Sequence, residues 1–475
     1  MAHIDDRSVT IVTTLLIIDG RHSFCSKHIR SETINMQTMM GNNDMNDLKS
    51  ETMRANIRRG ERTRVVIVGC GLGGLKLAVS LRHSGFQVVV VDKNNYNQFP
   101  PLIYQVASAG LEPSNIAFPI RRLFQGYPHY YFRMAEVKAI DEKEKAIQTS
   151  IGTIHYDYLV LGMGATTNFF GNEQIARNAF PMKTVGDAMA LRNHILHNLE
   201  LAETETDADK RQKFMNVVIV GGGPSGVEIA GALAEMKKYV VPRDYPDLAD
   251  RMHIYLVNSG DRLLKAMDKK SSASAEKELV RMGVHVCKGW RVTDYDGRVV
   301  RMKNGETIES ANVIWVSGVK ANTIVGVPDE AVGHAGRLLC DRMNRVTGMT
   351  NVFAIGDQSL IEGDAAWPLG HPQLAQVALQ QAENVARNIL RKEQGRDMKP
   401  FAYKNLGTMA TIGRKAAVAE IGRWKFGGLT AWLLWLVVHL RSILGVKNKF
   451  FVLLNWLWNY VNYKQSLRLI LRAGK

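Results

Sequence analysis

The sequence predicts an α/β fold with two similar nucleotide-binding domains and a C-terminal region of amphipathic helices. Three observations support this prediction. The stretch VVIVGCGLGGLKLAV at 65–79 is nearly repeated by VVIVGGGPSGVEIA at 217–230. A chain of 475 residues is longer than one hydrophobic core usually accommodates. The segment 401–475 holds twelve Lys and Arg residues against one acid, Glu420, which is +11 of the net charge of +16.

The first sixty residues match neither a secretory nor an organellar targeting signal. The apolar run at 11–18 is short, and Asp5 and Asp6 stand where a signal peptide carries positive charge. Segment 21–60 is polar and shows neither helical nor strand periodicity. We expect residues 1–60 to form a disordered extension.

The first glycine-rich stretch predicts a strand, a tight turn and a helix. The strand RVVIV runs directly into GCGLGG, where Gly69 allows the bend, Gly71 lets the backbone approach a pyrophosphate, and Gly74 lets helix and strand pack closely. The next apolar run, FQVVVVDKN, ends at Asp92 and Lys93, and a carboxylate at that position accepts hydrogen bonds from a ribose diol. A dinucleotide site is expected here. The alternative for Asp92 is a solvated loop acid.

The second stretch repeats this pattern with Gly221, Gly223 and Gly226, followed by the strand HIYLVN, which ends at Asn258. Gly318, after the strand NVIWVS, is assigned to the same site. Two such units can place two redox cofactors face to face and pass a hydride between them. A structural duplication that binds nothing would not need both sets of glycines.

Two later strands predict a return to the first domain. One runs into Gly162 and Gly164, and the other, NVFAI, runs into Gly356 and Asp357. The second unit is therefore expected to be inserted into the first. The predicted domains are 61–175 and 343–400 for the first Rossmann-like unit, 176–342 for the inserted unit, and 401–475 for the C-terminal region.

These motifs resemble those of the flavoproteins with two dinucleotide-binding domains. The resemblance implies FAD in the first unit, NAD(P)H in the second, and contact of Gly356 and Asp357 with the flavin side of FAD. The four cysteines lie far apart without a C-x-x-C pair, which excludes the dithiol reductases of that family and indicates a reduced compartment. No His cluster has metal-ligand spacing, so no metal is expected.

Within that family, three segments resemble the type II NADH:quinone oxidoreductases: 92–111, 371–389 with its A-Q-x-A-x-Q-Q motif, and 403–421. The resemblance implies that Gln376, Gln380 and Gln381 line the flavin and the quinone pocket, with Gln376 also at FAD. It places Lys415 near the quinone and Glu228 between the nicotinamide and quinone sides. Each of these assignments has a simpler alternative. Residues 375–381 could be an alanine-rich helix that packs closely on its neighbours, Lys415 a surface lysine, and Glu228 an acid that interacts favourably with the helix dipole.

The tail predicts helices that lie in a membrane interface. Its uncharged stretches, 426–440 and 450–463, are shorter than the about 20 residues that span a bilayer. Tryptophans accompany Leu and Val within them, and Lys and Arg gather at their ends, as interfacial helices on anionic lipid require. The alternatives are core helices or a dimer interface. The positive charge is concentrated in this tail, which favours a membrane surface with anionic lipids as a partner. We also expect a homodimer, which could form while the same tail touches lipid, and no nucleic-acid partner.

The resemblance implies a membrane-peripheral enzyme that passes a hydride from NADH to FAD and two electrons to ubiquinone or menaquinone without pumping protons. The cytoplasmic face of a bacterial inner membrane is favoured over a mitochondrial one. Because NADH-specific members read L-V-E-A-G where this chain reads LVNSG, Asn258 predicts use of NADPH as well. Arg262 could reach its 2′-phosphate, or it could only pack on the strand, since an arginine is common at this position in the family. The alternatives are a sulfide:quinone reductase-like enzyme and a slow-turnover NADH-sensing flavoprotein.

Overall fold

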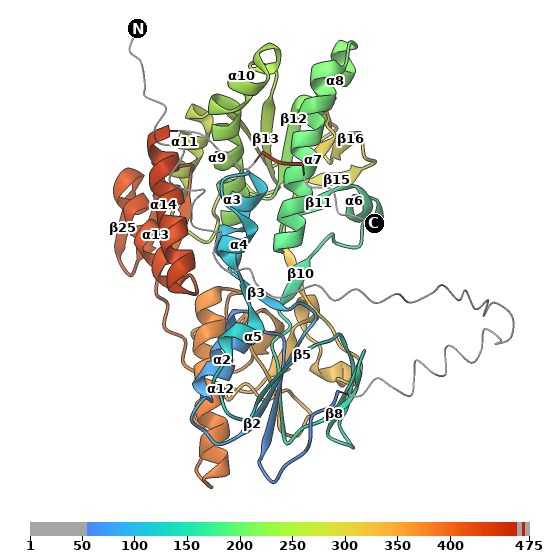
Figure 1. Cartoon of the computed structure of the whole chain (residues 1–475). Coiled ribbons are helices and arrows are strands. Elements are labelled where there is room, and N and C mark those ends of the chain that lie inside the picture. The colour runs from blue at the N-terminus through green and yellow to red at the C-terminus, as the bar shows by residue number, and fades with distance from the viewer. Residues whose placement is uncertain (1–54, 463–467, 471–475) are drawn as a thin grey trace, which may run out of the picture. The chain divides into compact units, whose positions relative to one another are not determined.

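The computed structural model describes residues 55–462 and 468–470 (Figure 1). Residues 1–54 of the predicted disordered extension lie outside the described residues. From Ala55 the chain packs on the first domain, where Arg133 Nε donates a hydrogen bond of 2.6 Å to the carbonyl oxygen of Ala55. The predicted boundary at residue 60 stays a prediction.

Five parallel strands form the first sheet, in the order β21-β9-β1-β2-β5. Their bounds are β1 Arg64–Val68, β2 Gln87–Asp92, β5 Tyr130–Met134, β9 Tyr158–Leu161 and β21 Val352–Ala354. Every residue of β1 is buried, as the β-branched sequence RVVIV predicts for a strand covered on both faces. The late strands β9 and β21 join this sheet, which confirms the predicted return to the first domain.

A second sheet of five parallel strands has the order β11-β18-β12-β13-β14. Its strands are β11 Phe180–Pro181, β12 Asn216–Val220, β13 His253–Asn258, β14 Val284–Lys288 and β18 Asn312–Trp315. All of them lie between β9 and β21 in the chain, so the second domain is inserted into the first. Where the chain crosses, β10 (Ala165–Thr167) pairs antiparallel with β19 (Val319–Ala321).

Smaller sheets and short strands complete the two domains. They are β6 Val137–Asp141, β7 Ala146–Thr149 and β8 Gly152–His155; β15 Val292–Tyr295, β16 Val299–Met302 and β17 Thr307–Glu309; β3 Tyr96–Gln98 with β4 Ala117–Pro119; and β20 Leu338–Cys340 with β22 Ser359–Ile361.

Helices cover the sheets and bring the later site residues together. In the first domain α2 (Leu72–Ser80) and α12 (Ala375–Glu393) lie side by side (Figure 1). The inserted domain carries α7 (Val185–Thr204), α9 (Pro224–Tyr239) and α11 (Lys269–Arg281), and α3 (Ile103–Ala107) from the first domain packs on α7 and α9. The shorter helices are α4 Pro113–Ile116, α5 Ile120–Leu123, α6 Glu173–Asn178, α8 Ala208–Met215 and α10 Val241–Asp244.

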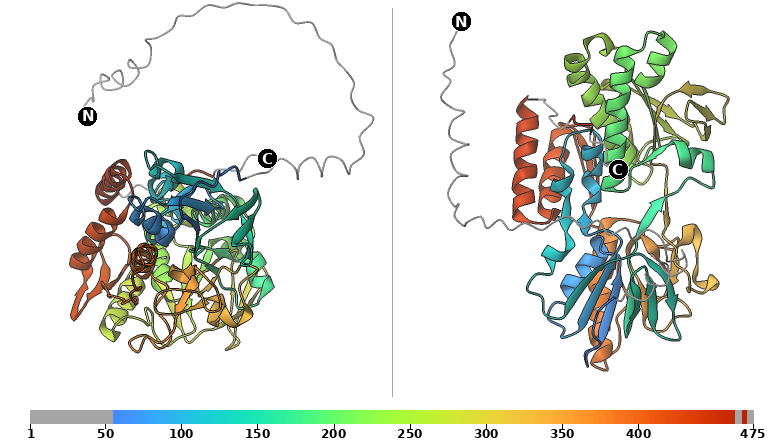
Figure 2. Two further views of the ribbon diagram at one scale, coloured as in Figure 1. Left: turned by 90° about the horizontal axis from the view of Figure 1, so that it is seen from below. Right: turned by 45° about the vertical axis from the view of Figure 1, so that its right-hand side comes forward.

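The C-terminal region is an antiparallel sheet followed by two helices. Its strands are β23 Thr408–Thr411, β24 Ala417–Ile421 and β25 Trp424–Gly427, and its helices are α13 Gly428–Ser442 and α14 Val446–Asn462. α9 packs on β23 and α13 packs on β24, while α13 and α14 (red) run side by side in both views of Figure 2. Among the described residues, no helix combines the length and apolar character needed to cross a bilayer.

Candidate functional site

Both glycine-rich turns adopt the sharp bend that the motif predicts. Gly69 has φ +94° and Gly221 has φ +125°, a backbone conformation that favours glycine. A Cβ at Gly74 would overlap the carbonyl oxygen of Gly69, and a Cβ at Gly226 would overlap that of Gly221. These four glycines are therefore required by the fold itself.

The middle glycine of each turn has a different basis. Gly71 (φ −69°) and Gly223 (φ −77°) have extended backbone that any residue adopts, and a Cβ at either position meets no atom within 4 Å. Each is the N-cap of the following helix and makes no side-chain capping bond. The chain alone does not need glycine here, so the open space and free helix N-terminus fit a bound diphosphate.

Asp92 and Asn258 end the second strand of their domains and hold the two turns in the same way. Asp92 Oδ2 accepts a hydrogen bond of 2.6 Å from the Cys70 amide, and Asn258 Oδ1 accepts one of 3.2 Å from the Gly222 amide. Burial raises the pKa of Asp92, while hydrogen bonds from the amides of Cys70 and Asn94 oppose the rise. Lys93 is exposed beside it.

The remaining polar atoms of Asn258 fasten the loop that follows β13. Its Nδ2 donates to the carbonyl oxygens of Gly260 at 3.2 Å and Arg262 at 3.0 Å. The Arg262 guanidinium in turn donates to the carbonyl oxygens of Lys265 and Met267. In this structure Arg262 therefore secures its own loop, in contrast to its expected reach toward a 2′-phosphate.

Gln381 leaves one buried donor unused near the predicted flavin position. Its Oε1 accepts a 2.7 Å hydrogen bond from the Gly356 amide, while its buried Nε2 has no hydrogen-bond partner among the described residues. Asp357 Oδ2 lies 3.1 Å from Lys183 Nζ, and a Cβ at Gly164 would meet open space. An unused buried donor beside a carboxylate and open backbone fits a polar ligand such as a flavin nucleotide.

Gln376 and Gln380 both fasten segment 404–407 to the start of α12. Gln376 donates to the Gly407 carbonyl oxygen at 3.0 Å and accepts from the Leu406 amide at 2.8 Å. Gln380 donates to the Lys404 carbonyl oxygen at 2.9 Å and accepts from the Lys404 amide at 3.0 Å. Both glutamine side chains therefore bind backbone.

Glu228 lies on the face of α9 that packs against β23. Loss of solvation raises the pKa of its carboxyl to about 8, and a hydrogen bond from the Thr411 amide opposes the rise. Thr411 Oγ1 lies 2.9 Å from the Tyr104 hydroxyl, which accepts a 3.0 Å hydrogen bond from Gln105 Nε2. A carboxyl that titrates near neutral pH is suited to proton transfer.

A second acid, Glu235, lies two turns further along α9 and pairs with the β23–β24 turn. Its Oε2 is 3.0 Å from Arg414 Nε, and both side chains are largely buried, at 12% and 14% exposed. The turn reaches the helix because Gly231 has no side chain: a Cβ there would lie 2.7 Å from the Gly413 nitrogen. Lys415 is exposed on this turn, and its charge lowers the pKa of Glu235 against the larger effect of burial.

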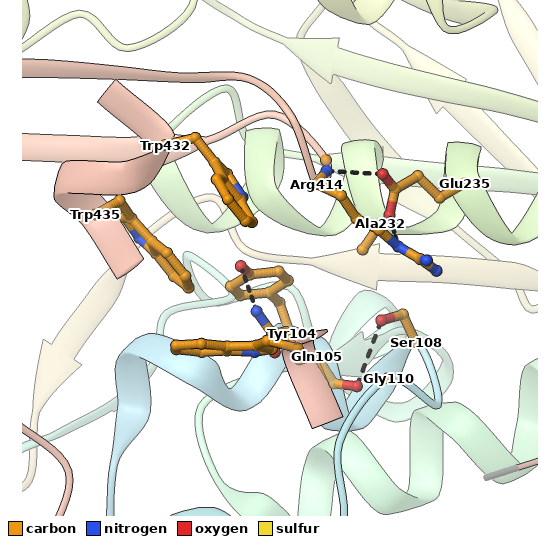
Figure 3. Close-up of a pocket in the computed structure, with 11 residues that line it drawn as sticks. Tyr104, Gln105, Ser108, Gly110, Ala232, Glu235, Arg414, Trp432 and Trp435 are labelled. Carbon is orange, nitrogen blue, oxygen red and sulfur yellow. Dashed lines mark hydrogen bonds and ion pairs between the residues drawn. The ribbon is translucent and has the colours of Figure 1, made fainter. Parts of the chain in front are cut away.

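A cavity of about 70 Å³ lies between these elements and the C-terminal helices (Figure 3). Gln105, Ser108, Glu235 and Arg414 contribute polar groups to its wall. Its aromatic walls come from Tyr104 of α3, Trp432 and Trp435 of α13, and Trp456 of α14. Aromatic walls with a few convergent polar groups fit a planar ligand of mixed polarity.

The structure therefore brings Glu228 close to Tyr104 and Thr411, and brings Glu235 close to Arg414; the sequence singled out none of these four residues. One available signal was the pattern on α9, where Glu228, Gly231 and Glu235 share a helix face by their three- and four-residue spacing. Their partners on α3 and β23 carried no comparable signal.

Comparison with known proteins yields two family matches. Residues 63–382 match the pyridine nucleotide-disulphide oxidoreductase family, and residues 405–462 match the NDH2 C-terminal domain. The type II NADH:quinone oxidoreductase NdhA of Mycobacterium tuberculosis is 34% identical over 415 residues, which cover 84% of this chain and 87% of that protein.

Solved structures support the same fold. A structure of NDH2 from Plasmodium falciparum in complex with NADH has a TM-score of 0.79 at 20% identity, covering 87% of this chain and all of that one. The sulfide:quinone oxidoreductase of Aquifex aeolicus is a more distant neighbour, with a TM-score of 0.64 at 17% identity over 79% of this chain and 90% of that one.

Proposed function

The chain belongs to the type II NADH:quinone oxidoreductase family and is therefore an enzyme that passes electrons from NADH to a quinone, and we propose which residues form the site for each step of this transfer. The overall reaction converts NADH, one proton and a quinone into NAD⁺ and a quinol. The observation that most directly supports two separate sites is the pair of open glycines, Gly71 and Gly223, which the fold does not need.

The first domain is proposed to hold FAD. Gly69, Gly71 and Gly74 shape the turn for its diphosphate, Asp92 lies at the ribose end, and Gln381 Nε2 supplies a buried donor. Gly164, Gly356 and Asp357 complete this site from the returning strands. When bound, a flavin accepts a hydride from a nicotinamide and releases two electrons to a quinone.

The inserted domain is proposed to bind NADH through Gly221, Gly223, Gly226 and Gly318. Asn258 stands at the ribose end of this site, where it leaves no negative charge to repel a 2′-phosphate. We therefore propose that NADPH is accepted as well as NADH.

Glu228 is proposed to hold or release the proton that quinone reduction consumes, because its carboxyl titrates at about pH 8. Gln376, Gln380 and Lys415 are proposed for the quinone side, where Gln380 would exchange its bonds to Lys404 for the ligand. The tryptophan-lined cavity is proposed as part of the quinone path, since two of its walls belong to helices with exposed apolar outer faces.

The protein is proposed to bind membranes peripherally, at the cytoplasmic face of a bacterial inner membrane. On α13 Leu433 and Val437 are exposed, and on α14 Phe450, Leu457 and Trp458 are exposed. The flanking charges within the described residues include Arg441 and Lys447, both exposed. An apolar face beside cations fits anionic lipid, and the same face remains a candidate for homodimer contact.

The test is steady-state oxidation of NADH and NADPH by flavin-loaded protein with a soluble quinone. NADH oxidation that depends on quinone is expected. NADH oxidation without quinone dependence would instead favour a slow-turnover NADH-sensing flavoprotein.

The burial and the positions of the cysteine thiols argue against a sulfide:quinone reductase-like function. Cys340 is fully buried in β20, where burial raises its pKa to about 12, while Cys287 lies in β14 of the other domain. Sulfide chemistry needs accessible thiolates of low pKa.

A further inference from the structure

A series of hydrogen bonds runs from α14 to Thr411 of β23, the strand that packs on α9 beside Glu228. Trp456 Nε1 donates to Gln105 Oε1 at 2.9 Å, and Gln105 Nε2 donates to the Tyr104 hydroxyl at 3.0 Å. The Tyr104 hydroxyl lies 2.9 Å from Thr411 Oγ1. β23, which carries Thr411, packs on α9, where the Thr411 amide lowers the pKa of Glu228 against the effect of burial. Four elements, α14, α3, β23 and α9, are thereby connected.

The first two donors in this series point in one direction. An indole N–H only donates, so Trp456 fixes which end of the Gln105 amide faces Tyr104. The Gln105 nitrogen then donates to the Tyr104 oxygen, while either hydroxyl can donate in the Tyr104–Thr411 hydrogen bond. The orientation of the Gln105 amide therefore depends on Trp456.

The middle of the series is shielded from water. Tyr104 is 6% exposed and Thr411 is 2% exposed. If either lost its partner, little solvent would be available to replace the hydrogen bond, so the position of Thr411 depends on its protein neighbours.

Trp456 belongs to the inner face of a helix whose outer face is apolar and exposed. Phe450, Leu457 and Trp458 point outward, whereas Val452 is fully buried and Trp456 packs against Trp435 with ring centroids 5.5 Å apart. A helix with an exposed apolar face on one side thus holds the first hydrogen bond of the series on the other.

We propose that Trp456 and Gln105 are positioning residues, which act through Tyr104 to hold the Thr411 amide against the Glu228 carboxylate and so couple docking of α14 to this acid. The proposal rests on the proposed function in one respect: that function gives Glu228 its role in the reaction and α14 its role at the membrane. The hydrogen-bond series itself is independent of that function.

Burial and the Thr411 amide are the two causes that set the pKa of Glu228. Burial and then the Glu228 charge raise the pKa of Tyr104 on α3, while the Arg414 and Lys415 charges on the β23–β24 turn act on Glu235, two helical turns away. The Thr411 amide opposes the effect of burial, so its displacement raises the pKa of Glu228 further.

The experiment is an infrared pH titration of the full-length, flavin-loaded protein. The protonated-carboxyl band of Glu228 is assigned by its loss in Glu228→Gln. Trp456→Phe retains an aromatic ring but removes the N–H, and Gln105→Met retains size but removes both hydrogen bonds. Tyr104→Phe serves as the inner variant, and Leu457→Ala, on the outer face of α14, is the matched control.

We expect the titration midpoint to move to higher pH by at least half a unit in Trp456→Phe and Gln105→Met, and further in Tyr104→Phe. Leu457→Ala is expected to keep the wild-type midpoint. An unchanged midpoint in both Trp456→Phe and Gln105→Met overturns the proposal, as does an equal shift in Leu457→Ala. The band titrates whether or not quinone is reduced, so failure of the proposed function would be seen separately, in turnover.

Discussion

We predict that nucleotide selectivity depends on the side chain at position 258, and two substitutions place a carboxylate there at different side-chain lengths. Asn258→Glu places a carboxylate at the end of β13, and Asn258→Asp does so with the original side-chain size. Asn258 accepts one hydrogen bond from Gly222 and donates two, to the carbonyl oxygens of Gly260 and Arg262. A carboxylate keeps the first bond and loses the other two.

The magnitude follows from these contacts. Two lost hydrogen bonds cost about 1 kcal/mol each in stability, and Asp adds repulsion between its oxygen and the two carbonyl oxygens. A negative charge about 4 Å from a 2′-phosphate is unfavourable by about 1 to 4 kcal/mol per unit charge, depending on the effective dielectric. We therefore expect kcat/KM for NADPH to fall by about 5-fold to several hundred-fold in Asn258→Glu, with a smaller change for NADH.

The assay is kcat/KM for both nucleotides in wild type and both variants, with thermal unfolding as the control for the loop. The wild-type enzyme is expected to prefer NADH by less than about a hundredfold, which is under about 3 kcal/mol. If the wild type already rejects NADPH by more than about a thousandfold, or about 4 kcal/mol, selectivity lies elsewhere and the reasoning about Asn258 is wrong.

Four further predictions follow from the geometry. Gly71→Val should fold normally and lose flavin, whereas Gly223→Val should keep flavin and raise KM for NADH; loss of folding in both, by circular dichroism, would contradict the free space at these positions. Gln380→Ala and Lys415→Ala should slow quinone reduction while flavin reduction by NADH stays near normal in stopped flow; equal loss in both half-reactions would refute their assignment. Deletion of 429–475 should abolish pelleting with anionic liposomes, while high salt weakens binding of the full chain only partly, because apolar insertion is not screened; unchanged pelleting after deletion would refute the anchor. Finally, the pKa of the Glu228 carboxyl is about 8 in the folded protein and has its ordinary value of 4.5 in the unfolded chain. The unfolding free energy should therefore fall as the pH rises from 4.5 to 8, by up to about 1.4 kcal/mol per pH unit. Denaturant titrations of Glu228→Gln should lack this pH-dependent component.

The sequence predicted the features that depend on local pattern. The runs RVVIV and NVVIV are buried parallel strands, the glycine turns follow them directly, and the late strand ending before Gly356 returns to the first sheet. Strand burial and tight turns are set by neighbouring residues, so a single sequence contains the necessary information.

The partners of the buried acids could not be predicted in the same way. Tyr104 and Thr411 are 307 positions apart, and Glu235 and Arg414 are 179 positions apart. These contacts depend on how α3 and the β23–β24 turn pack on α9, which no local pattern determines. The predicted Gln376 and Gln380 were correctly placed on a helix, but their backbone partners at 404–407 became visible only in the fold.

If one flavin links a nicotinamide site to a quinone site, anaerobic double-mixing stopped flow resolves its reduction and its reoxidation as separate steps. Flavin-loaded protein is mixed first with a stoichiometric amount of NADH and then with a soluble quinone, while flavin absorbance is followed. The flavin absorbance is expected to bleach in the first step and to recover fully in the second, each at least as fast as steady-state turnover. Bleaching without recovery on addition of quinone would show that the flavin does not pass its electrons to quinone.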